Sequence, residues 1–469
     1  MSINIHFLRY ALPNSEKIND NIFDNKNIAG ITIDSRVVKT DQIFLALQGD
    51  KFDGHDFLES ALDNGAIGLI IEKSKENFLK KIHKEKLENK LIIKVENSLK
   101  ALAELAKNYR QRFDYPVIGI TGSIGKTSTK EILKNILNCA QISAYISFKN
   151  QNNLIGLSLN ILNMKKSDKL AIFELGINNI GEMDELVDIL RPNMAVVTRI
   201  AFAHAQGLGD IASICREKLK IFKYFKFSEV GFVCGDQPQL CSFNHSYPII
   251  KFGIKTKNHI QARKITILPD SLKFILKIYK KNYKITMNNN HPGLVNNALA
   301  ASSVAQFLNI DINYIISGLQ TYNSFENRFE KKILKQNSGV LISDCYNASP
   351  ESMKMAIFAF GKMSCDGPRI AVIGDMLELG EKQVYWHRQL GKMFCKALNV
   401  DHVILVGNLA KIAAKTLPVT IKIDFAIDWQ SAKDRLEKLL QTYSEKKPLI
   451  LVKASRGVGL LNLVKELSM

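Results

Sequence analysis

The stretch Gly119-Ile-Thr-Gly-Ser-Ile-Gly-Lys-Thr-Ser128 decides the fold of the central part of this chain. It follows the apolar segment Val117–Ile120, which predicts a buried strand, and it precedes a helical pattern that begins near Lys126. A strand, a glycine-rich loop and a helix in this order are typical of a phosphate-binding loop. The strict pattern has glycine where this chain has Ile120, so the loop is the variant T-G-x-x-G-K-T. A chance glycine-rich turn is the alternative, and it leaves this coincidence of features unexplained.

The residue types in this loop suit the chemistry of phosphate binding. Gly122 and Gly125 allow the backbone to bend so that successive N–H groups face phosphate oxygens, and the helix N-terminus adds its positive dipole end. Lys126 can reach the β- and γ-phosphates, and the Thr127 hydroxyl can ligate Mg²⁺. The sequence therefore predicts a site for a nucleoside triphosphate. Its expected contacts are Thr121, Gly122, Ser123, Ile124, Gly125, Lys126, Thr127 and Ser128.

Outward from the loop, the chain predicts an α/β protein of three domains. Residues 1–100 alternate short strands with turns and predict a small mixed α/β N-terminal domain. Residues 101–322 predict a central P-loop ATPase domain with a parallel sheet. Within it, alternating apolar residues from about 250 to 288 predict antiparallel strands, at Leu272–Leu276 and Tyr283–Met287. Residues 323–469 predict a C-terminal Rossmann-like α/β domain, in which Pro350 stands in the first turn of a helix. Other strands are predicted at 43–47, 68–72, 91–95, 170–175, 340–344, 370–374, 403–407 and 449–452.

The composition excludes several classes of protein. The chain has 469 residues, of which 46% are apolar and 23% charged, as in ordinary globular proteins. Its seven cysteines form no C-x-x-C pair, so neither a zinc site nor a disulfide framework is predicted. No apolar run reaches the roughly 18 residues of a membrane helix, and no signal peptide is visible. We therefore expect a soluble cytoplasmic protein without a membrane span.

The charge balance is strongly basic, with 64 Lys and Arg residues against 45 Asp and Glu residues, a net charge of +19. Two explanations stay open: a lysine-rich solvated surface, or an excess that attracts polyanionic ligands. A basic P-loop ATPase that acts on nucleic acid is an alternative function. The sequence has no basic stretch interleaved with aromatic residues and no recognition-helix pattern, so we expect no nucleic-acid partner.

Further motifs follow one another along the chain. They are Asp34-Ser-Arg36, Phe52-Asp-Gly-His-Asp-Phe57, Asn152-Asn153-Leu-Ile-Gly156, Asp344-Cys-Tyr-Asn-Ala-Ser-Pro350, Ile373-Gly-Asp-Met-Leu-Glu-Leu-Gly380 and Leu451-Val-Lys-Ala-Ser-Arg-Gly457. Together with the loop they resemble the Mur ligase family, which are ATP-dependent enzymes that form amide bonds in peptidoglycan synthesis. The motifs at 344–350 and 373–380 are similar to the branch that adds D-alanyl-D-alanine to UDP-N-acetylmuramoyl-tripeptide. They argue against a sister branch and against a folylpolyglutamate synthase.

The resemblance implies a reaction and its partners. A carboxylate of UDP-N-acetylmuramoyl-tripeptide attacks the γ-phosphate of ATP to give an acyl phosphate, and the amine of D-alanyl-D-alanine then displaces phosphate. The implied cofactors are ATP and Mg²⁺, and the implied partners are these two small molecules, with the enzyme a monomer. Because an anion must approach a polyanion, the site needs positive charge focused on the transferring group.

The resemblance also implies a metal site formed by Thr127, Glu174, His204 and Lys218, the last as a carbamate. Glu174 ends a predicted strand, at the edge where α/β sheets bind ligands. The alternatives are a solvated strand end, a structural loop histidine and an exposed helix lysine. This chain departs from the family pattern nearby at Arg199, Gln206 and Lys220.

Four residues are similar to those that surround the nucleotide in the family: Asn297, Arg328, Asp344 and Asn347. Arg328 would bring charge to the phosphates when the last domain closes, Asp344 would bind the ribose, and Asn297 and Asn347 would lie near the base. Lys126, Lys218, His204 and Arg328 are the expected catalytic residues. Relatives usually have glycine at position 327, and the family's G-x-H is replaced here by 291–293, so His291 receives no role.

The resemblance places the UDP-sugar at the first domain and the dipeptide at the last. Arg36 suits a diphosphate because its planar fork makes paired hydrogen bonds. The expected substrate-binding residues are Asp34, Ser35, Arg36, His55, Asn153, Asp375 and Lys453. Glu378, His387 and Arg456 belong to the same dipeptide-side region.

Overall fold

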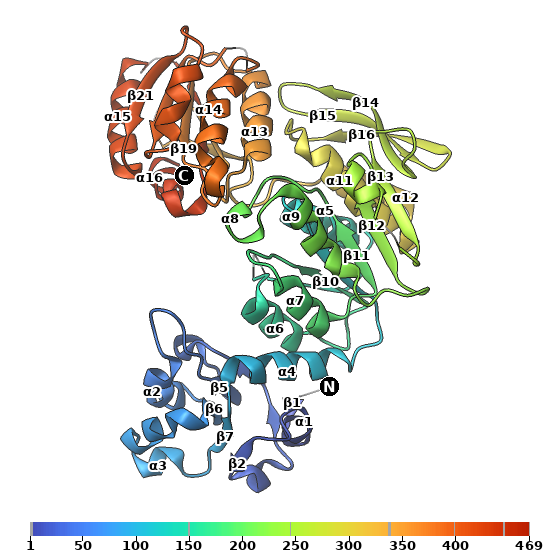
Figure 1. The fold of residues 1–469 in the computed structure, drawn as a ribbon, viewed down its shortest axis with the longest axis vertical. Coiled ribbons are helices and arrows are strands. Elements are labelled where there is room, and N and C mark those ends of the chain that lie inside the picture. Colours follow the sequence, from blue (N-terminus) through green and yellow to red (C-terminus); the bar gives the residue numbers. More distant parts are fainter. Residues whose placement is uncertain are drawn as a thin grey trace. The chain divides into compact units, whose positions relative to one another are not determined.

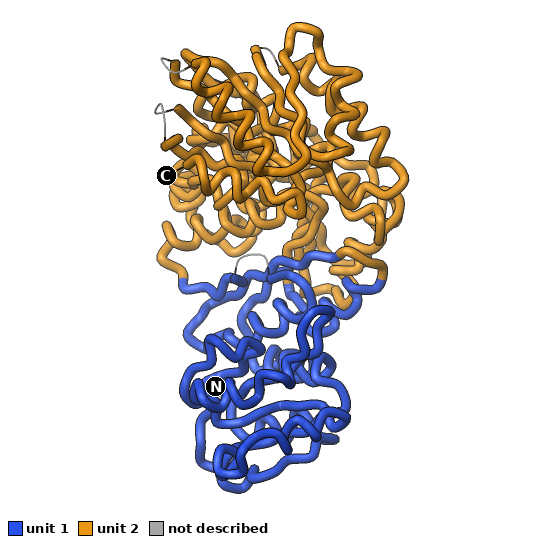
Figure 2. Tube along the Cα trace, turned by 90° about the vertical axis from the view of Figure 1, so that its left-hand side faces the viewer, with its two compact units in different colours: residues 1–119, 143–177, 181–193 blue, residues 120–142, 178–180, 194–469 orange. Residues whose placement is uncertain are grey.

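The structure is a computed structural model that describes residues 3–148, 151–243, 245–335, 339–397, 399–443 and 446–468. The chain divides into two compact units, coloured separately in Figure 2. Unit 1 comprises residues 1–119, 143–177 and 181–193, and unit 2 comprises residues 120–142, 178–180 and 194–469. Both units combine sheets with helices, in agreement with the predicted α/β class.

The first sheet of unit 1 has the strand order β2-β7-β6-β5-β4. Its strands are β2 (Glu16–Ile18), β4 (Gly30–Thr32), β5 (Gln42–Leu45), β6 (Gly68–Glu72) and β7 (Leu91–Val95). β2 is antiparallel to β7, and the other neighbours are parallel. Phe44, Leu69 and Ile92 form a core with Leu58, which opens helix α2 (Leu58–Asp63). The strands predicted at 68–72 and 91–95 are confirmed, whereas the strand predicted at 43–47 already ends at Leu45.

The rest of unit 1 continues the α/β pattern. Its elements are β1 (Ile3–Asn4), α1 (Ile5–Ala11), β3 (Asn27–Ile28), α3 (Lys84–Leu87), α4 (Ser98–Arg110), β9 (Ala144–Ile146), α6 (Leu154–Leu162), β10 (Leu170–Glu174) and α7 (Glu182–Leu190). Buried Arg110 donates hydrogen bonds to the carbonyls of Leu190 and Phe113, which ties the end of α4 to the end of α7. β9 and β10 are parallel, and β10 ends at Glu174.

Strand β8 (Val117–Thr121) begins in unit 1 and ends in unit 2, where the phosphate loop and α5 (Lys126–Cys139) follow. Six strands of unit 2 are neighbours in chain order: β11 (Met194–Val197), β12 (Val230–Cys234), β13 (Ile249–Gly253), β14 (Ile260–Ile267), β15 (Leu272–Ile278) and β16 (Lys281–Met287). They are parallel from β11 to β14 and antiparallel from β14 to β16. The antiparallel strands predicted at 272–276 and 283–287 are confirmed, whereas the antiparallel region predicted from about 250 is wrong for β13, which is parallel to both of its neighbours. The helices here are α8 (Ala205–Leu208), α9 (Ile211–Leu219), α10 (Pro238–Cys241), α11 (Gly293–Phe307) and α12 (Ile312–Gln320).

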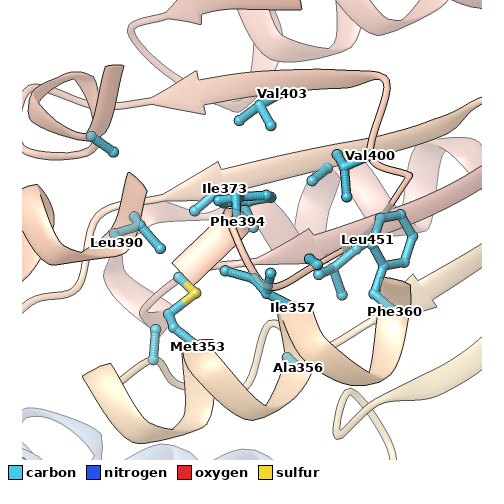
Figure 3. Close-up of a cluster of buried hydrophobic side chains, with 14 of the residues drawn as sticks. Met353, Ala356, Ile357, Phe360, Ile373, Leu390, Phe394, Val400, Val403 and Leu451 are labelled. Atoms are coloured by element: carbon cyan, nitrogen blue, oxygen red, sulfur yellow. The ribbon is translucent and has the colours of Figure 1, made fainter. Parts of the chain in front are cut away.

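The last part of unit 2 is a doubly wound sheet with the order β17-β18-β22-β19-β20-β21. The strands are β17 (Glu330–Ile333), β18 (Val340–Ser343), β19 (Arg369–Gly374), β20 (His402–Val406), β21 (Lys422–Ala426) and β22 (Leu449–Lys453). Only β17, of these six, runs antiparallel to its neighbour. Helices α13 (Pro350–Lys362) and α14 (Gln383–Phe394) contribute to one core, and α15 (Trp429–Thr442) and α16 (Leu460–Leu467) to the other. Figure 3 shows the first core, where Ile357 and Phe360 lie near Ile373 and Leu451.

Local sequence signals explain where these helices begin. Pro350 occupies the first turn of α13, as predicted, and Ser349 caps the helix while Ser352 bonds back to the Ser349 backbone. The domain boundaries at residues 100 and 322 stay predictions; residue 100 lies within α4, and residue 322 follows α12. Within the described ranges, the structure has no helix with the length and apolar character needed to cross a membrane.

Candidate active site

The phosphate loop connects the end of β8 to the first turn of α5. Gly122 has φ +146° and Gly125 has φ +90°, a region that side chains with a Cβ rarely adopt. A Cβ on Gly122 would collide with the Thr198 hydroxyl, and one on Gly125 would collide with the side-chain oxygen of Asn297. The loop therefore requires glycine at both positions, for conformation and for space.

The residues after β11 support this loop through backbone contacts. Thr198 donates its backbone N–H to the Thr121 carbonyl at 2.9 Å and its hydroxyl to the Ile124 carbonyl at 2.7 Å. The Arg199 carbonyl accepts a 2.7 Å hydrogen bond from the Ser123 N–H. Because Arg199 contacts the loop through its backbone carbonyl, this contact does not depend on the side chain at position 199. Sequence reasoning missed Thr198, which directly follows β11.

Two cations lie at the loop. The Lys126 ammonium donates a 2.8 Å hydrogen bond to the Gly122 carbonyl. Arg328 donates a 2.8 Å hydrogen bond from Nη2 to the hydroxyl of Thr127, which is almost fully buried. The guanidinium also lies 3.9 Å from the ring centroid of Tyr346, a favourable cation–π arrangement. Residues 126, 127 and 328 therefore come together as a positively charged group beside the predicted phosphate site, with Tyr346 as a support that the sequence did not reveal.

The backbone on either side of Arg328 is held in an unusual conformation. Asn327 has φ +58° and Phe329 has φ +53°, so two left-handed residues flank the arginine. Asn327 accepts a hydrogen bond from the Ser343 hydroxyl at 2.8 Å, and the Phe329 N–H donates to the Asp344 carboxylate at 3.2 Å. Asparagine adopts the left-handed conformation more readily than most residues with a Cβ, so Asn327 suits this position. These contacts aim Arg328 at the loop.

Lys453 lies at the predicted nucleotide side, whereas the resemblance placed it at the dipeptide side. Its side chain is 1% exposed, and its ammonium is 2.7 Å from an Asp344 carboxylate oxygen. The ammonium also donates to the Asn347 carbonyl at 3.1 Å. Asp344 and Asn347 thus lie together around one buried cation, and the contacts of the Lys453 ammonium with both residues hold this turn.

The residues expected to bind metal have distinct surroundings. Glu174, in unit 1, is 1% exposed and accepts a 2.9 Å hydrogen bond from the Asn152 side chain. In unit 2, His204 Nδ1 lies 2.5 Å from a Glu378 carboxylate oxygen, and this contact lowers the pKa of Glu378. Pairing of Nδ1 leaves Nε2 as the nitrogen that would face a metal. Glu378 was expected near the dipeptide, so this pairing is a feature that only the structure reveals.

Lys218 is fully buried on α9, which excludes the alternative of an exposed helix lysine. Burial disfavours an ammonium, and conversion to a carbamate would remove that positive charge. Among the described residues, no cluster of three or more His, Cys, Asp or Glu side chains forms a metal site. Of the four residues expected to bind metal, only Glu174 and His204 are of these four residue types. Thr127 would contribute its hydroxyl, and Lys218 would contribute its carbamate.

Several expected substrate contacts have structural partners instead. His55 is 1% exposed, its Nδ1 lies 2.6 Å from Asp53, and its Nε2 accepts the Glu72 N–H at 3.1 Å. Burial acts to raise the pKa of the Asp53 carboxyl, but hydrogen bonds from Lys75 and His55 outweigh it and lower this pKa to about 2. Both ring nitrogens of His55 are therefore occupied, and the residue fixes its loop rather than presenting a free imidazole.

Of the other residues expected to contact substrate, some are exposed and others hold the local structure. Arg36 is exposed and pairs with Asp34 through two side-chain hydrogen bonds of 2.8 and 2.7 Å, and side-chain hydrogen bonding from Arg36 lowers the pKa of Asp34. Ser35 is buried in the same turn. The side-chain oxygen of Asn153 caps α6, accepting from the Gly156 N–H at 2.9 Å. Asp375 accepts a 2.6 Å hydrogen bond from the Ala410 N–H. In this group, the charged side chain of Arg36 is the most exposed, at 84%, and that of its partner Asp34 is 37% exposed.

Two further histidines have structural surroundings. Burial lowers the pKa of His291 to about 4, and its Nδ1 accepts a 3.2 Å hydrogen bond from the Gly293 N–H at the start of α11. His387 is fully buried, and its Nε2 accepts the Met376 N–H at 2.9 Å. Its ring therefore fixes the turn after β19.

Comparisons with known proteins agree with this organisation. Three family models match the chain in order: "Mur ligase family, catalytic domain" over residues 27–110, "Mur ligase middle domain" over 120–305 and "Mur ligase, glutamate ligase domain" over 327–456. The UDP-N-acetylmuramoyl-tripeptide–D-alanyl-D-alanine ligase of Bacillus subtilis (strain 168) is 33% identical over 446 residues, covering 95% of this chain and 94% of the relative. The corresponding ligase of Rickettsia prowazekii (strain Madrid E) is 33% identical over 452 residues, covering 94% and 96%.

Solved structures show the same relationship. MurF from Acinetobacter baumannii has a TM-score of 0.86 at 26% identity, covering 99% of this chain and 98% of that one. The MurF ligase from Thermotoga maritima in complex with ADP has a TM-score of 0.79 at 27% identity, covering 93% and 96%. These matches confirm the predicted three-domain α/β architecture. The chain belongs to the Mur ligase family, within the group of UDP-N-acetylmuramoyl-tripeptide–D-alanyl-D-alanine ligases.

Proposed function

We propose that this protein is an ATP-dependent ligase that joins D-alanyl-D-alanine to UDP-N-acetylmuramoyl-tripeptide and releases ADP and phosphate. The relatives matched over nearly the whole chain carry this activity in their names. The observation that carries the proposal is the group formed by Lys126, Thr127 and Arg328 at a glycine-constrained loop. Two cations gathered at such a loop suit the transfer of a γ-phosphate to a carboxylate.

The chemistry follows from charge. The tripeptide carboxylate must approach the γ-phosphate of ATP, and the transition state spreads negative charge over the equatorial oxygens. The loop N–H groups and the α5 N-terminus bind the phosphates, and Lys126 turns from the Gly122 carbonyl to a phosphate oxygen. Arg328 leaves the Thr127 hydroxyl for the phosphates, where its fork can make paired hydrogen bonds. The acyl phosphate then reacts with the amine of the dipeptide, and phosphate leaves.

Mg²⁺ fits the donors that this chain offers, and when bound it would neutralise charge on the phosphates. We propose Thr127, Glu174, His204 and carbamylated Lys218 as the residues that hold it. The support is the family resemblance, the burial of Lys218 and the commitment of His204 Nδ1 to Glu378. Thr127 becomes available when Arg328 moves to the phosphates.

The nucleotide and substrate contacts are also proposals. Asn297, Asp344 and Asn347 hold the base and ribose, and buried Lys453 positions Asp344. Asp34, Ser35, Arg36, Asn153 and Asp375 form the substrate-binding set, in which His55 is a positioning residue. The domains proposed for these tasks are residues 1–100 for the UDP-sugar, 101–322 for ATP and 323–469 for closure over the nucleotide. Closure would exclude water from the acyl phosphate.

The reaction is tested by release of phosphate from ATP and Mg²⁺ with purified UDP-N-acetylmuramoyl-tripeptides and D-alanyl-D-alanine. We expect turnover only when every component is present, because the acyl phosphate is consumed by the dipeptide amine. Mass spectrometry should detect the pentapeptide product. Turnover that ignores D-alanyl-D-alanine and is stimulated by nucleic acid would contradict the proposal and support the ATPase alternative.

Lys218→Ala tests the carbamate. We expect roughly a hundredfold loss of turnover, because a residue that holds the metal is removed. Added acetate should restore part of it by replacing the missing carboxylate. Arg216→Ala is the matched control, since Arg216 is an exposed residue of the same helix. Full activity of Lys218→Ala without any added carboxylate would end the carbamate assignment.

A further inference from the structure

The antiparallel strands of unit 2 carry charge that the ligase chemistry does not use. Residues 249–287 contain ten basic residues and one acidic residue, so these 39 residues supply +9 of the net charge of +19. The basic residues are Lys251, Lys255, Lys257, Arg263, Lys264, Lys273, Lys277, Lys280, Lys281 and Lys284. Almost half of the basic excess is therefore concentrated in one short stretch.

One side of these strands is core and the other is open. Alternate residues of β15, such as Leu272, Phe274 and Leu276, are buried. Helices α11 and α12 contact β14 and β16, and Figure 1 shows them packed against these strands. Since successive side chains of a strand point to opposite faces, the residues between the buried ones face outward. The outward cations of β14–β16, which we call the basic face, are Arg263, Lys273, Lys277 and Lys284.

The strand register spaces these charges apart. Lys273 lies opposite Thr286, Lys277 lies opposite Asn282, and Lys284 lies opposite Ile275. Ile275 of β15 also has Arg263 opposite it, on the neighbouring strand β14. Like charges directly opposite one another would destabilise the sheet, and this register avoids them. The strands therefore keep a dense positive charge without acidic partners of their own.

The charge of the basic face is available to a partner. Within the described part of the chain, none of its four cations forms an ion pair. Asp270, the acidic residue of this stretch, lies at the β14–β15 turn and pairs with Lys331 at 2.7 Å. Arg263 donates a hydrogen bond to the neutral side chain of Gln261.

The basic face is too far from the phosphate loop to serve ATP. In the sheet, β15 lies four strand positions away from β11. Thr198, which directly follows β11, supports the phosphate loop. At about 4.8 Å between neighbouring strands, this separation is roughly 19 Å. The Debye length at physiological ionic strength is about 8 Å, so exposed charges at this distance are largely screened from the nucleotide.

We propose that the basic face binds the surface of an anionic lipid bilayer. Nine of the ten cations in this stretch are lysines, whose compact charges suit diffuse attraction to anionic headgroups. Exposed apolar residues also lie in or directly after these strands: Ile265 of β14 is 38% exposed, Ile254 after β13 is 53% exposed and Tyr279 after β15 is 55% exposed. Nucleic-acid sites favour arginine forks and rows of stacking aromatic residues. The basic face has one arginine, and Tyr279 is its exposed aromatic neighbour, so a bilayer is the better fit.

Sedimentation of the full chain with vesicles tests this proposal. One set of vesicles is phosphatidylcholine alone, and the other is an equimolar mixture with phosphatidylglycerol. We expect binding to the mixture only, with an affinity that falls as salt rises. The triple variant Lys273→Gln, Lys277→Gln, Lys284→Gln should bind roughly a hundredfold more weakly, since each lysine near an anionic surface contributes about a fivefold effect. Its melting temperature and its ligase turnover should equal those of the wild type.

The matched control is a second triple variant with the same change in net charge. This variant carries Lys396→Gln, Lys415→Gln and Lys438→Gln, which alter three exposed lysines of the last domain. Its affinity for the mixed vesicles should stay within about twofold of that of the wild type. Equal losses in both variants would overturn the proposal, because net charge alone would then explain binding. Absence of binding to the mixed vesicles would also overturn it. Tighter binding of a single-stranded or duplex nucleic acid, lost in the first variant only, would replace the bilayer with that partner.

Discussion

Lys126→Ala is expected to lower turnover by roughly a thousandfold while the protein stays folded. The ammonium lies at the phosphate loop, 2.8 Å from the Gly122 carbonyl, and its charge would oppose the negative charge of the transferring phosphoryl group. The side chain is half-buried at the start of α5, so its truncation leaves little disturbance in the core. Phosphate release at saturating substrates measures the loss, and circular dichroism checks the fold.

Lys134→Ala is the control for this experiment. Lys134 lies on the same helix with its side chain 46% exposed, and its ammonium is 3.6 Å from Glu131, whose carboxylate keeps a second cation, Lys130, at 3.5 Å. Such pairs contribute about 1 kcal/mol or less, so we expect near wild-type turnover and stability. If Lys126→Ala keeps turnover within tenfold of the wild type, the loop does not hold the reacting phosphate and the assignment fails.

Lys453→Met is expected to lower the melting temperature by roughly 10 °C. The ammonium is 1% exposed and pairs with Asp344 at 2.7 Å, so the substitution leaves a carboxylate without its cation in a largely buried turn. Removing one partner of a buried pair costs about 3–5 kcal/mol, and each kcal/mol shifts the melting temperature of a domain of this size by about 2–4 °C. The double variant Lys453→Met, Asp344→Asn should recover part of the loss, because the stranded charge is removed.

The same variant separates two roles for Lys453. If the residue positions Asp344 for the nucleotide, KM for ATP rises and KM for D-alanyl-D-alanine stays unchanged. A rise in KM for the dipeptide alone would instead support the placement that the family resemblance implied. Lys433→Met is the matched control, because Lys433 pairs with Glu466 at 3.3 Å on the surface. We expect its melting temperature to fall by no more than about 2 °C.

Structural features that depend on residues close together in the sequence could be predicted from the sequence. The phosphate loop required a strand, two glycines and a helix start, all within residues 117–128, and the structure has them there. The first turn of α13 followed from Pro350, and the antiparallel strands followed from alternating apolar residues. The family and its ligase group could also be named, because several motifs agreed in order.

Features that depend on distant contacts could not be predicted from residue patterns. His55 stands in a family motif, but only the fold shows that Asp53 and the Glu72 N–H occupy both ring nitrogens. Lys453 stands in another motif, and its buried pairing with Asp344 appears only when β22 and β18 are neighbours. A motif records which residues a site contains, whereas it leaves open which of them touch one another.

By itself, the sequence determined that this chain has a phosphate loop, three α/β domains and the motifs of a Mur ligase, because each depends on local periodicity or on short segments. The tertiary structure alone decided that Arg328 reaches Thr127 across 201 positions and that Lys453 lies beside Asp344. It also decided that four cations share the open side of β14–β16, since strand register sets which side chains face solvent. The physical reason is that chain topology fixes distant neighbours, and no local pattern encodes that topology.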